Sequence, residues 1–244
     1  MEPFSPVITT LRYFLLLMSH LPGFPREVRD QAPPDSVVYH VSPGSRLVVK
    51  TGKSGLLGFA GHSHVIRAGA VAGQLVYHPG TPASSLRLKV PTKSLEVLTP
   101  PDTAEIRKVT QAMRTEVLHV EKYPEMTFAA DSLSAKSGKM DMRLRVTLEG
   151  TTRQIPVTAD VTIGPDTIRA RGTFTAKQTD FGIKPYSGGP AGTVKVADRV
   201  TFCFDLLGVR AGAQSPGAQP PAEAGDGTTV PGCVERTETS PAPF

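Results

Sequence analysis

Residues 140–177 alternate apolar and polar side chains almost without interruption. Three segments, 142–148, 155–163 and 168–176, place apolar side chains at nearly every second position. A period of two predicts β-strands with one buried face and one face in water. The joints Glu149-Gly150-Thr151 and Gly164-Pro165-Asp166 are short and contain turn-forming residues. Because short joints make neighbouring strands antiparallel, we predict an up-and-down meander with one dry face.

The same alternation predicts further strands on both sides of this meander. They cover residues 37–41, 46–51, 63–77, 85–90, 126–130 and 193–208. Residues 102–118 predict a helix, because Asp102 and Glu105 form a capping box and apolar residues follow at spacings of three and four. About eight strands with one dry face remove their edges best by closing into a barrel. We therefore predict an all-β fold, a single eight-stranded antiparallel barrel with one inserted α-helix.

The chain divides into three parts by composition. Residues 1–36 form a lead with several prolines, residues 37–210 form the barrel domain, and residues 211–244 form a tail rich in Pro, Gly and Ala. The tail has too little apolar surface to offset the entropy of ordering, so we expect disorder there. The apolar run Tyr13–Met18 follows Arg12 and is short for the core of an export signal. A weak signal segment and a disordered lead both remain open.

The charge is unevenly distributed along the chain. The formal net charge is +5; residues 211–244 contain four acidic residues and one arginine, so they carry −3 and residues 1–210 carry +8. A basic excess is typical of a solvated outer sheet face, and it is also compatible with anionic lipid headgroups or nucleic acid. We predict no nucleic-acid partner and leave a peripheral contact with an anionic membrane open.

Four short motifs, in this order, resemble the YceI-like family. They are Gly61-His62-Ser63-His64, Tyr123-Pro124-x-Met126-x-Phe128, Leu148-Glu149-Gly150-Thr151-Thr152 and Asp180-Phe181-Gly182. The resemblance covers about residues 37–210. It implies a lipocalin-like barrel with a helix near its mouth, which binds polyisoprenoid or quinone-like lipids in an apolar bore. It also implies an exported bacterial protein, periplasmic or secreted, and a possible homodimer, although the weak signal segment leaves the cytoplasm open.

The inward face of the barrel is the candidate lipid site. The inward residues that we expect to contact lipid are Leu75, Leu88, Phe128, Leu144, Val157, Phe174 and Phe202. The small residues Ala159, Ala170, Gly172 and Ala176 leave room among them. Alternation by itself is equally compatible with a filled core, and the resemblance favours a bore that holds an isoprenoid-type lipid. The predicted function is therefore a non-enzymatic carrier, with no catalytic residue, metal or cofactor.

His62 and His64 support an alternative function. In a strand, two histidines separated by one residue point the same way, as metal ligands can. A metal- or haem-dependent small enzyme on the same barrel could use this pair, but it would need a third ligand that the sequence does not indicate.

Overall fold

The computed structural model describes residues 36–54, 63–98, 103–188 and 194–213. The strands are β1 (Val37–Val41), β2 (Arg46–Ser54), β3 (Val65–Ala68), β4 (Ala72–Tyr77), β5 (Ser84–Pro91), β6 (Leu95–Val97), β7 (Glu125–Lys136), β8 (Lys139–Leu148), β9 (Thr151–Ile163), β10 (Thr167–Lys177), β11 (Ser187–Gly188) and β12 (Val194–Arg210). The helical elements are α1 (Thr103–Ala112), the π-helical turn η2 (Met113–Val117) and the 3-10 turns η1 (Thr92–Ser94) and η3 (Gln178–Phe181).

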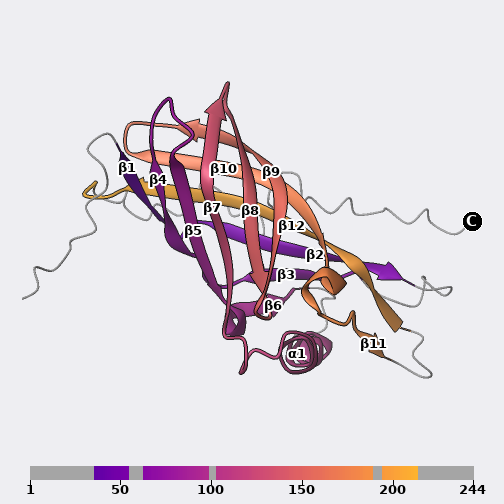
Figure 1. Cartoon of the computed structure of the whole chain (residues 1–244). Helices are drawn as coiled ribbons and strands as arrows, with labels where there is room; N and C mark the ends of the chain where they lie inside the picture. The colour runs from indigo at the N-terminus through magenta and orange to yellow at the C-terminus, as the bar shows by residue number, and fades with distance from the viewer. Residues whose placement is uncertain (1–35, 55–62, 99–102, 189–193, 214–244) are drawn as a thin grey trace, which may run out of the picture. The chain divides into compact units, whose positions relative to one another are not determined.

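Eight of these strands close into an antiparallel barrel, as the sequence predicts (Figure 1). The order around the barrel is β1-β4-β5-β7-β8-β9-β10-β12, and β12 pairs with β1 to complete the circle. The closing register runs from Tyr39 opposite Arg210 to Val41 opposite Gly208. Closure pairs each of these strands with a neighbour on both sides over at least part of its length.

The predicted meander is present as β8, β9 and β10. β8 and β9 pair over ten residues without a register shift, from Lys139 opposite Asp160 to Leu148 opposite Thr151. The turn between them has positive φ at both Glu149 (46°) and Gly150 (74°). Two consecutive positive φ angles match the right-handed twist of a hairpin, which is why the short joint brings β9 back beside β8.

A side branch of the sheet departs from the prediction. The region 63–77, expected as one strand, is two strands that pair with different partners: β3 with β2 and β6, and β4 with β1 and β5. The chain breaks at Gly69, whose N–H donates to the carbonyl of Ser94 at 2.8 Å. A Cβ at Gly69 would lie 2.9 Å from that oxygen, so the turn requires glycine. Alternation alone could not show this break, because both strands keep the same period.

The single helix lies beside one end of the barrel, near β3 and β6 (Figure 1). It is shorter than the expected 102–118: α1 ends at Ala112 and continues as the π-helical turn η2, while Asp102 lies outside the described residues. Arg114 fixes this turn to β6, because its Nη2 and Nε donate to the carbonyl of Leu95 at 2.9 and 3.2 Å. We call this the helix end of the barrel, and the opposite end, with the β7–β8 turn at Ser137 and Gly138, the hairpin end. No helix in the described part of the chain combines the length and apolar character needed to cross a bilayer.

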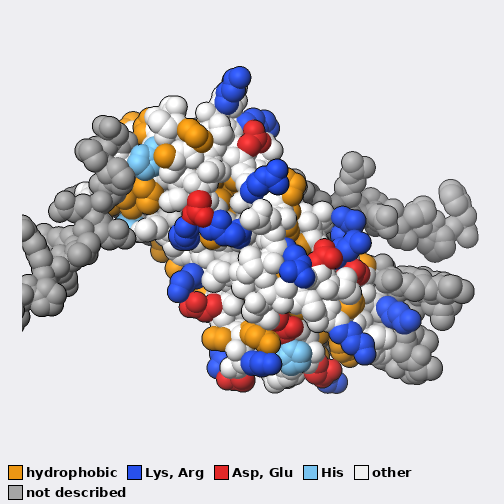
Figure 2. Space-filling model, in the orientation of Figure 1, with side chains coloured by type: hydrophobic (Ala, Val, Ile, Leu, Met, Phe, Trp, Pro, Cys, Tyr) orange, Lys and Arg blue, Asp and Glu red, His pale blue; other side chains and the backbone are white. Residues whose placement is uncertain are grey.

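Charged side chains on the outer face form several ion pairs, and Figure 2 shows blue and red groups interleaved there. The most buried carboxylate is Asp205 of β12, 6% exposed, which accepts two hydrogen bonds from Arg169 at 2.6 Å each. Arg171 lies 3.3 Å from the same carboxylate. Burial raises the pKa of Asp205, but the hydrogen bonds and charge of Arg169, and then of Arg171, outweigh burial and hold this pKa below its ordinary value. Asp205 therefore stays ionised and ties β10 to β12 on the outside.

Candidate functional site: an apolar cavity in the barrel

Part of the barrel interior toward the helix end is filled by the protein's own side chains. Val90 and Val146 are fully buried there, and Val97 and Met126 are 2% and 4% exposed. These side chains belong to one continuous core with Met113 of η2. Val90, Val146 and Met126 belong to the packed core here, whereas Val97 and Met113 also line a second pocket, described below.

Three phenylalanine rings pack together beyond this filled region. Phe174 and Phe202 are stacked with ring centroids 4.7 Å apart, and Phe128 meets both edge-on at 6.5 and 6.2 Å. The three rings come from β7, β10 and β12, so they join strands that are not all neighbours in the sheet. Phe128 and Phe174 also face the cavity described next.

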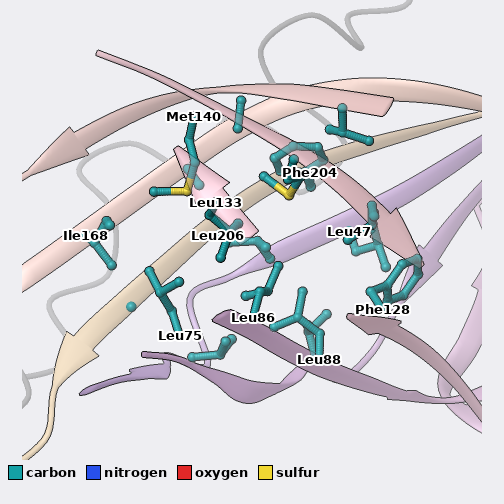
Figure 3. A pocket seen from close by; sticks show the side chains of 18 of the residues that line it. Leu47, Leu75, Leu86, Leu88, Phe128, Leu133, Met140, Ile168, Phe204 and Leu206 are labelled. Atoms are coloured by element: carbon teal, nitrogen blue, oxygen red, sulfur yellow. The ribbon is translucent and has the colours of Figure 1, made fainter. Parts of the chain in front are cut away.

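The interior on the hairpin side of these rings is hollow. A cavity of about 80 Å³ extends from the level of Phe128 to Tyr39 and Ile168. Its lining is formed by Tyr39, Val41, Leu47, Val71, Leu75, Leu86, Leu88, Phe128, Leu133, Met140, Met142, Leu144, Val157, Ala159, Ile168, Ala170, Phe174, Phe204, Leu206 and Gly208. In Figure 3 the labelled side chains, which carry only carbon and sulfur, point from opposite walls toward this space. Several inward residues, including Leu86, Met142 and Leu206, are only half-buried because they border it.

Tyr39 contributes the one polar side-chain group among the described residues that line the cavity. Burial raises the pKa of the Tyr39 phenol, against an opposing effect of Arg210, so the phenol stays protonated. The rest of the lining cannot hydrogen-bond, so transfer of water into the cavity is hardly favourable. Transfer of an apolar guest from water into the cavity lowers the free energy.

Six of the seven residues predicted to contact lipid lie on this cavity, and the seventh does not. Leu75, Leu88, Phe128, Leu144, Val157 and Phe174 line it. Phe202 instead packs behind Phe128 and Phe174. Of the predicted small residues, Ala159 and Ala170 line the cavity. Gly172 adds no free space to the cavity, because the Phe204 ring already fills the place of its side chain: a Cβ there would lie 2.7 Å from the ring.

Other lining residues were missed although their signal was present in the sequence. Met140, Met142 and Leu206 continue the same two-residue alternation as Leu144 and Phe202. Tyr39 and Val41 follow the same rule on β1. Alternation gives the face of each strand but not the height of each residue along the barrel, which depends on the register between strands.

A second, more polar pocket lies at the helix end. Its volume is about 460 Å³. Its lining combines the polar residues His64, Glu105, Lys108, Tyr186 and Lys195 with apolar side chains that include Ile66, Val97, Val109, Met113 and Val117. It shares no lining residue with the apolar cavity. His64 is half-buried there and its backbone N–H donates to Oγ1 of Thr51 at 3.1 Å, whereas His62 lies outside the described residues. Within the described part of the chain, no three His, Cys, Asp or Glu side chains are grouped as metal ligands.

Parts of three family-like motifs support the barrel, whereas Phe128, which ends the second motif, lines the cavity. Gly150 of the β8–β9 turn lies against the ring of Tyr123, because a Cβ there would be 3.4 Å from Cε1. Next to it, Nδ1 of His119 and Oε1 of Glu149 are 2.6 Å apart. Phe181 is 2% exposed and Gly182 has φ of 80°, so this motif packs a ring and turns the chain after β10.

Fold and cavity together define a closed antiparallel barrel with a partly empty apolar interior. Residues 42–207 match the YceI-like domain, and the chain belongs to the YceI-like family. A comparison with curated proteins gave no match.

Two of the solved structures that resemble this chain illustrate the shared fold. One is BcnA from Burkholderia cenocepacia, with a TM-score of 0.53 and 16% identity over 67% of this chain and 95% of that protein. The other is a polyisoprenoid-binding domain from Saccharophagus degradans, implicated in plant cell wall breakdown, with a TM-score of 0.54 and 14% identity over 71% of this chain and 98% of that one.

Proposed function

We propose that this protein is a non-enzymatic carrier that holds a long apolar lipid of the polyisoprenoid or isoprenoid-quinone class inside its barrel. The observation that carries the proposal is the cavity between Tyr39 and Phe128, whose lining consists almost entirely of hydrocarbon and thioether groups. The description of the Saccharophagus degradans structure as a polyisoprenoid-binding domain supports the choice of ligand class. The proposal assigns no catalytic residue and no metal.

Burial of the guest supplies the binding free energy. Each buried methylene contributes about 0.8 kcal/mol, so a few isoprene units are enough for stable retention. The role of Leu75, Leu88, Phe128, Leu144, Val157, Phe174 and Phe202 as lipid contacts follows as part of the proposal.

The cavity is narrow, so a bound chain must displace side chains from its axis. Met140 and Met142 lie on the wall, and methionine is the residue best able to change rotamer without loss of packing. The half-buried Leu86 and Leu206 have adjacent free space into which they can rotate. We therefore expect the empty barrel to be collapsed relative to the loaded one.

The test is to identify what the purified full-length chain holds. Organic extraction and mass spectrometry should recover an isoprenoid lipid, and the stripped protein should bind an isoprenoid quinone saturably at one site per chain. A water-soluble quinone headgroup without its isoprenoid tail is the control, and it should bind far more weakly. No extracted lipid together with no saturable binding of the long-chain quinone would overturn the proposal.

A further inference from the structure

The barrel wall is incomplete between β9 and β10. The two strands pair over only four residues, from Ile163 opposite Ile168 to Asp160 opposite Arg171. β9 remains paired with β8 back to Thr151, and β10 remains paired with β12 on to Lys177. The described residues therefore show no ladder between 151–158 of β9 and 173–177 of β10, and we call this gap the β9/β10 seam.

Two residues explain why the ladder stops. Pro156 lies in the half of β9 that pairs with β8 but not with β10, and proline has no N–H to donate, so sheets hold it at their edges. Gly172 lies where the strands part: the Phe204 ring occupies the place of its side chain, and a Cβ there would also lie 3.2 Å from the carbonyl oxygen of Thr158. η3, the orange turn above β11 in Figure 1, packs beside the seam with Phe181 buried.

The outside of the seam is a groove with a basic rim. Its lining includes Arg153 on β9, Lys177 at the end of β10 and Arg199 on β12, against one carboxylate, Asp180. Arg153 donates to the carbonyl of Thr152 at 3.0 Å and Arg199 donates to Oγ1 of Thr175 at 3.2 Å. Among the described residues, none of these three cations is ion-paired with a carboxylate, unlike Arg169 with Asp205. We call these three residues the seam cations.

Other charges near the groove do not reverse its sign. Asp198 lies next to Arg199 in sequence. It accepts hydrogen bonds from the N–H and hydroxyl of Thr179 at 2.9 and 2.8 Å, and it interacts electrostatically with Lys177. The described residues as a whole contain 23 Lys and Arg against 13 Asp and Glu, a formal charge of +10. The groove therefore carries a net positive charge, and so does the described part of the chain as a whole.

We propose that the seam cations dock the protein on an anionic lipid bilayer, with the β9/β10 seam facing the membrane. A bilayer fits better than nucleic acid or an acidic protein because the carrier must take its apolar guest from a membrane. The groove and the apolar cavity have no lining residue in common, and β10 links them: Ala176 lines the groove and Phe174, two residues earlier, lines the cavity. A bilayer is the anionic partner that also contains apolar guests, and this part of the argument rests on the proposed carrier function.

Cosedimentation with vesicles tests the docking surface. The full chain should bind vesicles of phosphatidylcholine with about one third phosphatidylglycerol, should not bind pure phosphatidylcholine, and should release steeply as salt rises. The triple variant Arg153→Gln, Lys177→Gln, Arg199→Gln should bind the anionic vesicles roughly a hundred-fold more weakly. Thermal unfolding of the variant should match that of the original chain, because these side chains are not part of the core.

A matched variant separates local docking from general charge. Lys136→Gln, Arg143→Gln, Arg210→Gln removes the same charge from positions outside the groove and should change vesicle affinity by less than about fivefold. Equal loss in both triple variants, or tighter binding to an oligonucleotide than to anionic vesicles, would overturn the proposal. Binding of isoprenoid quinone, measured without vesicles, should be unchanged in the seam variant. If the original chain binds anionic vesicles but no isoprenoid, the carrier function fails while the docking surface stands.

Discussion

Phe174 of β10 and Phe202 of β12 lie directly opposite one another in the ladder, and their rings stack with planes 4° apart and centroids at 4.7 Å. Phe128 closes the group from β7, across the bore. The group lies between the packed core around Val90 and Val146 and the apolar cavity on the hairpin side. This boundary means that one barrel contains both a packed core, which supplies stability, and an empty space, which is available for a guest.

Phe202→Ala should be strongly destabilising. The ring is 3% exposed and supports both other rings, so its removal leaves a void that the neighbouring strands cannot fill. We expect a loss of about 3–5 kcal/mol in the free energy of unfolding, measured by urea denaturation. Ile163→Ala is the control, because Ile163 is 45% exposed and its loss should cost less than about 1 kcal/mol. Similar losses in both variants would show that the rings are not a structural support.

Ala170→Leu should reduce lipid binding without unfolding the protein. Ala170 is half-buried and lines the cavity, so a larger side chain occupies space that the guest needs. We expect at least a tenfold loss in affinity for an isoprenoid quinone, with the free energy of unfolding changed by less than about 1.5 kcal/mol. Ala129→Leu is the matched control: Ala129 lies on β7 opposite Arg145, next to Phe128 along the strand, and does not line the cavity. Unchanged quinone affinity in Ala170→Leu would place the guest elsewhere.

Asp205→Asn should weaken the barrel in a pH-dependent way. The substitution removes the carboxylate that holds Arg169 and Arg171, which should cost about 1.5–3 kcal/mol at neutral pH. The pKa of Asp205 is lower in the folded chain than in the unfolded chain, so its stabilisation is fully present above the unfolded pKa of about 3.9 and is lost as pH falls through the folded value. Urea unfolding of both proteins at several pH values should show the difference shrinking below about pH 4. A difference that stays constant down to about pH 2 would contradict the ion-pair explanation.

Gly172→Ala should lower the free energy of unfolding, because the new Cβ would collide with the Phe204 ring. The new Cβ would lie 2.7 Å from Cζ of Phe204, so the ring must move toward the cavity, at a cost of about 1–3 kcal/mol in the free energy of unfolding. In a Phe204→Leu background the same substitution should cost much less, because the contact is gone. A double-mutant cycle measures this coupling, and additive losses would assign the cost to the backbone of β10 instead.

The barrel and its meander were predictable because their signal is local. Alternation from Met142 to Ala176 sets the face of each residue, and the short turns set the strand direction. The division of residues 63–77 into β3 and β4 was not predictable in this way, since it depends on Gly69 meeting Ser94, a contact between distant parts of the chain. The β9/β10 seam did have a local signal. Pro156 interrupts an otherwise regular strand, and it indicates an unpaired edge that the alternation conceals.

The sequence predicts which face of each strand lines the candidate site, but not how far along the barrel each residue lies. The inward faces of β4, β5, β7, β8, β9 and β10 are those the sequence indicates. Phe202 lies on the correct face and directly opposite Phe174, yet its ring packs against Phe128 and Phe174 instead of lining the cavity. The boundary between the filled and hollow halves depends on how strands of different length are staggered, and the sequence of one strand does not contain that information.

β12 pairs with β1, β2, β10 and β11, and it follows all of them in the chain. During synthesis on a ribosome, none of these four pairings can form until residues 194–210 have emerged. The earlier strands must wait as an open sheet with its hydrocarbon face exposed, so nascent chains should depend on helper proteins that shield such surfaces. Contacts this distant in sequence also make the final assembly step slow.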